Sequence, residues 1–294
     1  MHDINFSHEH ELKKHDFLGC CRDCQASLDI IKPHIMGFAK RIKKYSRNML
    51  EALKPEDLYR LYQLLDDLAH MQAGVHLAGL ILDEPDIREE LPAIRSYYST
   101  FFDIHEKHLA QDLLTAKDPW DTLKSFPFYP RYEALVKTQI QAAHPSPGSR
   151  LAFIGCGPVP MTLILMSRLY GIRSIGLDNS EETVNVSKKV IQCLGLEKQI
   201  QIIQGDESGL IDLDWDLVLV AALAEPKARI FKTLCKILKQ RKAHTPVIFR
   251  TYTGMRAVLY KPVQPGDIQG FSIVKEILPI GRVNNTTVFA ELDL

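Results

Sequence analysis

The sequence has no excess of charge and no long apolar run. Its 36 lysines and arginines balance 36 aspartates and glutamates over 294 residues, which gives no electrostatic basis for binding nucleic acid or an acidic membrane surface. No apolar stretch reaches the roughly 20 residues that a membrane-spanning helix needs. The first residues, MHDINFSHEHELKKHDF, lack the basic-then-apolar order of a signal peptide. We therefore expect a cytoplasmic protein that acts on small-molecule substrates, with a homodimer left open.

Cysteine is also scarce. The six cysteines show no regular framework of spacings, which fits reduced thiols better than structural disulfides. Cys21 and Cys24 have the C-x-x-C spacing of half a zinc site, and other metal-binding side chains precede them: His8, His10, His15 and Cys20. The second half of a zinc motif is missing. A site completed by the nearby histidines stays open, but a mobile, thiol-bearing tail is the simpler interpretation, and we assign no metal to the protein.

The pattern of apolar residues changes near residue 145. Before it, apolar residues recur at helical spacing, as in Leu58, Leu61, Leu65 and Leu68, which predicts an all-helical domain over residues 1–143. The segment HPSPG at 144–148 is rich in helix breakers. Beyond it, short apolar runs alternate with helical patterns. This alternation predicts an α/β fold over residues 144–294, a Rossmann-like domain with a mostly parallel sheet.

The expected strands are LAFIG (151–155), SIGLD (174–178), IQIIQGD (200–206), DLVLVAAL (216–223) and TPVIFRTY (245–252). The helices expected between them cover 160–170, 181–194 and a segment near 227–239. The last two apolar runs, SIVKEIL and NNTTVFAELDL, are expected to close the sheet as an antiparallel pair.

A glycine turn follows the first expected strand. Gly155 and Gly157 let the backbone come close to a ligand there, but Pro160 stands where a dinucleotide fingerprint has its third glycine. Asp178 and Asp206 end the next two strands and are placed to accept hydrogen bonds from a nucleoside. Together these features favour S-adenosylmethionine over a ligand with a pyrophosphate. Both aspartates can also cap the segments that follow them.

Several motifs carry a resemblance to the nicotianamine synthase family: FPFYPRY (126–132), IGCGPVP (154–160), LVAAL (219–223), FRTYTGMRAVLY (249–260) and VNNTTV (283–288). The resemblance implies a helical domain that caps a Rossmann-like domain. It also implies transfer of the 3-amino-3-carboxypropyl group of S-adenosylmethionine to an amine, with release of methylthioadenosine. We expect no metal to be needed for catalysis, because the metal would bind the released product. The product would be nicotianamine or a related metallophore.

The resemblance also implies roles for individual residues. Glu106 aligns with an acidic position that would serve as the base for the incoming amine, and Tyr129 and Tyr132 would form the wall that orients it. Residues of the glycine turn and the following strand ends would hold the donor: Gly155, Gly157, Pro158, Asp178, Asn179, Asp206 and Ala221. The carboxylate of the transferred group needs a cation, for which Arg250 and Arg256 are the candidates, with Tyr260 as a further substrate contact.

Other interpretations remain open at this point. Glu106 could lie on a solvated charged helix face, and Tyr129 and Tyr132 could be core aromatics. The chain could instead be a methyltransferase acting on a small amine, or a nucleoside sensor without turnover. Phe128 replaces a tyrosine that is common in the plant enzymes, and AEPK (224–227) is a shorter connection than theirs. The sequence does not decide the acceptor, the number of transfers or whether an azetidine ring closes.

Overall fold

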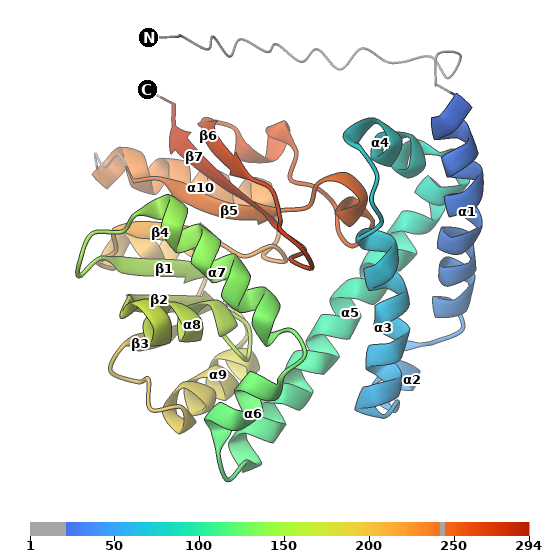
Figure 1. Ribbon diagram of the computed structural model, residues 1–294. Coiled ribbons are helices and arrows are strands. Elements are labelled where there is room, and N and C mark those ends of the chain that lie inside the picture. Colours follow the sequence, from blue (N-terminus) through green and yellow to red (C-terminus); the bar gives the residue numbers. More distant parts are fainter. Residues whose placement is uncertain (1–21, 242–244, 294) are drawn as a thin grey trace.

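The computed structural model describes residues 22–241 and 245–293 (Figure 1). The described part begins with the helices α1 (Arg22–Ile42), α2 (Arg47–Glu51), α3 (Pro55–Ala69), α4 (Val75–Asp83), α5 (Pro85–Thr115), α6 (Pro119–Ser125) and α7 (Tyr129–Ala143). Of the histidines and cysteines near the start of the sequence, only Cys24 lies within the described residues, and His8, His10, His15, Cys20 and Cys21 lie outside them. Sγ of Cys24 is 3.6 Å from Nδ1 of His76.

The second half alternates strands and helices as the sequence predicts. Its strands are β1 (Arg150–Ile154), β2 (Arg173–Asp178), β3 (Ile200–Gln204), β4 (Leu217–Val220), β5 (Val247–Thr251), β6 (Phe271–Ile277) and β7 (Thr286–Leu292). Its α-helices are α8 (Met161–Tyr170), α9 (Glu181–Cys193) and α10 (Lys227–Arg241), and its 3₁₀ helices are η2 (Glu207–Asp212), η3 (Gly254–Val258) and η4 (Pro265–Ile268).

The sheet has the strand order β3-β2-β1-β4-β5-β7-β6. Strands β1 to β5 are parallel, and β7 and β6 close the edge as an antiparallel pair. The mostly parallel sheet and its antiparallel edge are therefore confirmed. Because β1 lies between β2 and β4, the connections leave β1 in opposite directions, and a crevice opens at the carboxyl ends of these strands.

Local sequence explains why the helical elements form where they do. In α3, Pro55 occupies the first turn, and the leucines at 58, 61, 65 and 68 are buried on one face. The longest helix is α5, with 31 residues. At a rise of 1.5 Å per residue it extends roughly 46 Å. The Glu84 side chain caps α5 by accepting a hydrogen bond from the Ile87 amide.

The helical half and the sheet share one apolar core. A single cluster of buried residues continues from α1 and α3 through α5 to one face of the sheet, and a second cluster lies on the opposite face beneath α10. Figure 1 shows α1 to α5 beside the sheet, with α7 lying across it. By its packing against α8, α7 joins the sheet although it precedes the linker at 144–148. The long helix α5 belongs to the same cluster, and it brings side chains of the helical half to the carboxyl ends of the strands.

No helix among the described residues combines the length and apolar character needed to cross a membrane.

Candidate active site

A cavity of about 420 Å³ lies at the carboxyl ends of the central strands, between the sheet and the helices α5 and α7. Its wall on the sheet side comes from the segments after β1, β2, β3 and β4, including the residues Gly155, Gly157, Asp178, Asn179, Asp206 and Ala221. Its wall on the helical side includes Tyr98, Phe102, Glu106, Phe128, Arg131 and Tyr132. The loop before β7 adds Asn284 and Asn285. The cavity thus joins residues from both halves of the sequence.

The glycine turn after β1 adopts a backbone that disfavours side chains. Gly155 and Gly157 have φ values of +78° and +72°, which few L-residues adopt. A Cβ atom on Gly155 would lie 2.8 Å from Cβ of Ala224, and one on Gly157 would lie 3.1 Å from Oε2 of Glu106. The turn therefore needs glycine both for its conformation and for the space around it.

Asp178 ties the end of β2 to the glycine turn. Its Oδ2 accepts a hydrogen bond of 3.1 Å from the Gly157 amide, and its Oδ1 accepts one of 3.1 Å from the Ser180 amide. Asp206 accepts hydrogen bonds from the amide and hydroxyl of Ser208, which lower the pKa of its carboxyl. Asp206 is the N-cap of η2, whereas α9 is capped by Ser180, whose amide donates to Asp178. Both aspartates also line the cavity. For Asp206, the two predicted roles are therefore compatible.

Glu106 reaches the cavity from α5. It is only partly exposed, and its removal from bulk water raises the pKa of the carboxyl to about 8, with a smaller contribution from the charges of Asp103 and Asp178. The Tyr132 hydroxyl forms a hydrogen bond with Glu106. Burial also raises the pKa of Tyr132, so that this residue stays a neutral phenol at physiological pH. Glu106 is thus a carboxyl group that can exchange a proton near neutral pH.

Arg250 is a buried cation on β5. It is 5% exposed, and its Nη2 donates to Oε1 of Gln139 at 2.9 Å and to Oγ1 of Thr162 at 2.8 Å. Its Nε has no hydrogen-bond partner, and no ion pair joins it to a carboxylate of the described residues. Burial lowers the pKa of Arg250 to about 10, which still leaves it charged. An unmatched guanidinium in a cavity wall is suited to an anionic group of a ligand.

Four residues singled out in the sequence do not line this cavity: Tyr129, Pro158, Arg256 and Tyr260. Tyr129 begins α7 and packs against the apolar core. Arg256 donates from Nε and Nη2 to backbone carbonyls of the loop before β7, each at 2.8 Å. Tyr260 lies against the Tyr252 ring, with 5.9 Å between the ring centroids.

The cavity also contains residues that the sequence did not single out. Arg131 and Asn284 lie within two of the quoted motifs, FPFYPRY and VNNTTV, so a signal for them was present. Phe102 and Tyr98 stand one turn and two turns before Glu106 on α5, and helical spacing from Glu106 identifies them as neighbours on its face. Among the residues described, no three histidine, cysteine, aspartate or glutamate side chains are grouped so as to hold a metal ion.

The chain is similar to nicotianamine synthases and to a bacterial aminobutanoyltransferase. The family model described as "Nicotianamine synthase protein" matches residues 25–293. Nicotianamine synthase 1 of Arabidopsis thaliana is 24% identical over 253 residues, which cover 82% of this chain and 79% of that protein. L-histidine 2-aminobutanoyltransferase of Pseudomonas aeruginosa is 24% identical over 142 residues, or 48% of this chain. That match spans about half of the relative's length, 53%.

Solved structures extend the comparison to the whole fold. The crystal structure of MtNAS in complex with MTA and tNA has a TM-score of 0.82 and 34% sequence identity, covering 94% of this chain and 100% of that one. A glutamate-to-glutamine mutant of MtNAS in complex with S-adenosylmethionine has a TM-score of 0.81 and the same identity and coverage.

Proposed function

The chain belongs to the nicotianamine synthase family, and on that premise we propose that it transfers the 3-amino-3-carboxypropyl group of S-adenosylmethionine to an amine and releases methylthioadenosine. The observation that carries the proposal is the position of Glu106. Its carboxyl lies over the glycine turn, where Oε2 would be 3.1 Å from a Cβ on Gly157. A proton acceptor thus faces the segment that would hold the donor.

The reaction requires a neutral amine. The amine nitrogen attacks Cγ of the methionine-derived chain, the bond from Cγ to sulfur breaks, and its electron pair stays on sulfur as the neutral thioether. An ammonium has no free electron pair, so it first gives a proton to the Glu106 carboxylate. The hydroxyl of Tyr132, which interacts with that carboxylate, helps to orient it.

All three carbons on the sulfonium are electrophilic, so placement selects which one reacts. We assign the donor's nucleoside to the wall formed by Gly155, Gly157, Asp178 and Asp206, and its methionyl carboxylate to Arg250. With both ends of the donor held, the chain carbon Cγ is presented to the amine and the methyl group points elsewhere. The MtNAS mutant that binds S-adenosylmethionine indicates that a relative retains its donor when one glutamate loses its charge.

The product class and location belong to the same proposal. Aminocarboxypropyl groups add amines and carboxylates to the acceptor, and these are ligands for divalent metals, so we propose a metallophore of the nicotianamine type as the product. We assign the reaction to the cytoplasm, because six cysteines without a disulfide framework fit a reducing compartment. Whether the protein forms a homodimer is tested by light scattering, which measures the mass of the purified protein in solution.

The sulfur-bearing by-product tests the proposed reaction. Purified protein is incubated with S-adenosylmethionine alone and then with individual amino acids, and the by-product is identified by mass spectrometry. We expect methylthioadenosine. Its formation without an added acceptor indicates condensation of donor molecules, and its formation only with an amino acid indicates a single transfer. S-adenosylhomocysteine as the by-product would show that the methyl carbon reacts and would contradict the proposal.

Substitution of Gly155 by alanine tests the donor wall. The new Cβ would meet Cβ of Ala224 at 2.8 Å in addition to the strain of a positive φ, so we expect a loss of stability of about 2 kcal/mol or more and weaker binding of S-adenosylmethionine. Gly148→Ala is the matched control, because Gly148 has a φ of +86° but nothing lies within 4 Å of its Cβ position. Thermal unfolding and donor titration measure both effects; equal donor affinity in the two variants would remove Gly155 from the site.

A further inference from the structure

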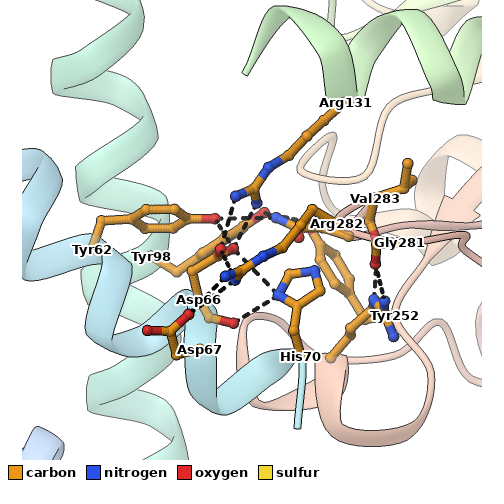
Figure 2. A network of polar contacts seen from close by, with 12 residues as sticks. Tyr62, Asp66, Asp67, His70, Tyr98, Arg131, Tyr252, Gly281, Arg282 and Val283 are labelled. Atoms are coloured by element: carbon orange, nitrogen blue, oxygen red, sulfur yellow. Dashed lines mark hydrogen bonds and ion pairs between the residues drawn. The ribbon is translucent and has the colours of Figure 1, made fainter. Parts of the chain in front are cut away.

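Three arginines and no lysine line the cavity among the described residues: Arg131, Arg229 and Arg250. Two of these arginines are neutralised by carboxylates. The two Nη atoms of Arg131 donate to the two carboxylate oxygens of Asp66 at 2.6 and 2.8 Å (Figure 2), and Nε of Arg229 lies 3.1 Å from Oε1 of Glu207. Arg250 differs from them, because its hydrogen-bond partners among the described residues are neutral. Its charge is therefore the one that stays uncompensated in the cavity wall.

Gln139, on α7, occupies the place at Arg250 that a carboxylate takes at the other two arginines. It is 0% exposed, and its Oε1 accepts the hydrogen bond of 2.9 Å from Nη2 of Arg250. Oγ1 of Thr162 accepts the second N–H of Nη2 at 2.8 Å. The three donors on Nε and Nη1 have no hydrogen-bond partner among the described residues. Gln139 thus orients the guanidinium without adding a negative charge.

The other end of the Gln139 amide is also engaged. Its Nε2 donates to Oγ1 of Thr287 at 3.1 Å, and Thr287 lies opposite Arg250 in the antiparallel register of β5 and β7. A flipped amide would place its N–H donors against the guanidinium, so only the observed orientation satisfies both neighbours. Gln139 itself does not line the cavity. Its effect on a ligand therefore passes through Arg250.

The neutrality of Gln139 matters because the donor and its by-product differ in charge. S-adenosylmethionine carries a carboxylate, whereas methylthioadenosine has the same nucleoside and no carboxylate. A glutamate at position 139 would have the same shape, and the Thr287 hydroxyl would donate to it instead of accepting a hydrogen bond. That glutamate would pair with Arg250 and cancel most of the charge that attracts the carboxylate of a ligand. Contacts to the nucleoside would stay the same.

We propose that Gln139 is a positioning residue whose neutral amide keeps the charge of Arg250 available to the donor, and that it thereby sets the preference for S-adenosylmethionine over methylthioadenosine. This inference rests on the proposed transfer reaction and on the assignment of the donor carboxylate to Arg250. In that reaction the carboxylate leaves with the amine product. The by-product then lacks the group that Arg250 holds, so it competes weakly with the next donor molecule.

The binding of two unreactive ligands tests the inference. S-adenosylhomocysteine keeps the nucleoside and the carboxylate of the donor without its sulfonium, methylthioadenosine lacks the carboxylate, and calorimetry measures both affinities. The wild type should bind S-adenosylhomocysteine more tightly by about tenfold or more. Gln139→Glu should bring the two affinities to within about threefold of each other by weakening S-adenosylhomocysteine alone. In the transfer assay, the ratio of the inhibition constant of methylthioadenosine to the KM of S-adenosylmethionine should fall by about tenfold in this variant.

Gln141→Glu is the matched control, because it adds the same charge at an exposed position of α7. It should keep both affinities within about twofold of the wild type. Gln139→Met removes the hydrogen bonds of the amide and adds no charge. It should therefore lower the preference for S-adenosylhomocysteine by only about threefold, which is less than the effect of Gln139→Glu.

A merely structural role for Gln139 would weaken the two ligands equally, or would make Gln139→Met as damaging to the preference as Gln139→Glu. Either result would overturn the inference. A wild type that binds the two ligands equally would overturn it as well, even if neither variant at position 139 folds. Release of methylthioadenosine from S-adenosylmethionine by the wild type is measured separately, and it supports the transfer reaction whatever the ratio of the two affinities.

Discussion

Glu106→Gln is expected to abolish aminocarboxypropyl transfer while leaving the binding of S-adenosylmethionine nearly unchanged. Glutamine has the shape of the protonated carboxyl but accepts no proton, so the amine stays an ammonium and cannot attack. Loss of a positioned base lowers a rate by about 10²- to 10⁴-fold. Methylthioadenosine release under saturating donor measures the rate, and donor titration measures binding. An unchanged rate would remove Glu106 from the mechanism.

The dependence on pH gives a second measure of Glu106. Its pKa of about 8 means that the carboxyl is mostly protonated at pH 7 in the free protein. Because the base must be deprotonated, kcat/KM for the donor should rise with pH up to about 8. The sulfonium and ammonium of a bound donor stabilise the carboxylate, so the limb of the kcat profile should lie at lower pH. A kcat/KM that does not vary between pH 6 and pH 9, or so, would contradict this assignment.

Stability should respond to Glu106 in the opposite sense to activity. Its pKa is higher in the folded chain than the ordinary value of 4.5, so the folded state binds the extra proton and stability falls as pH rises from about 4.5 to about 8. Glutamine does not ionise, so Glu106→Gln removes this fall in stability with pH. The melting temperature of the variant at pH 8 should therefore equal or exceed that of the wild type, which separates an inactive variant from an unfolded one.

Arg250→Met should weaken the binding of S-adenosylmethionine by about 10- to 100-fold. The variant removes the cation assigned to the donor's carboxylate and keeps a side chain of similar length. Since the guanidinium has no carboxylate partner, its loss leaves no buried charge unpaired, and the chain should still fold although Gln139 and Thr162 each lose a hydrogen bond. Calorimetric titration of S-adenosylmethionine measures the effect.

Methylthioadenosine is the matched ligand for this variant, because it shares the nucleoside and lacks the carboxylate. Its affinity should be the same for the wild type and for Arg250→Met. Equal losses for both ligands would instead mean that Arg250 supports the fold of the cavity through Gln139 and Thr162.

Much of the fold was predictable because its signals are local. The strands and helices after residue 150 follow from apolar runs and glycine turns, and the observed helices at 161–170, 181–193 and 227–241 lie within two residues of the predicted ones. The antiparallel edge strands also follow from the sequence. The packing of α7 against α8 was not predictable, because α7 precedes the breaker segment and belongs to the sheet only through tertiary contacts.

Residues of the candidate site could be predicted from the sequence where a recognisable motif falls at the carboxyl end of a strand. Gly155, Gly157, Asp178, Asp206 and Arg250 follow strands or lie at their carboxyl ends, and all line the cavity. Arg256 and Tyr260 share a motif with Arg250, but they lie in and after a 3₁₀ helix that turns them away from the cavity.

Asp66 could not be found from the sequence. It stands beside Asp67 within an amphipathic helix, where a pair of aspartates indicates a solvated face. Its buried carboxylate is paired with Arg131 and Arg282, which come from positions 65 and 216 residues further along the chain. Long-range ion pairs of this kind leave no local pattern of spacing.

The most direct test of the transfer reaction follows the carbon atoms of the donor. S-adenosylmethionine labelled with ¹³C in the methyl group, and in a separate sample in the four-carbon chain, is turned over by the protein, and product and by-product are separated and weighed by mass spectrometry. We predict the chain label in the amine product and the methyl label in methylthioadenosine. Methyl label in the amine product, with the chain label retained in S-adenosylhomocysteine, would contradict it.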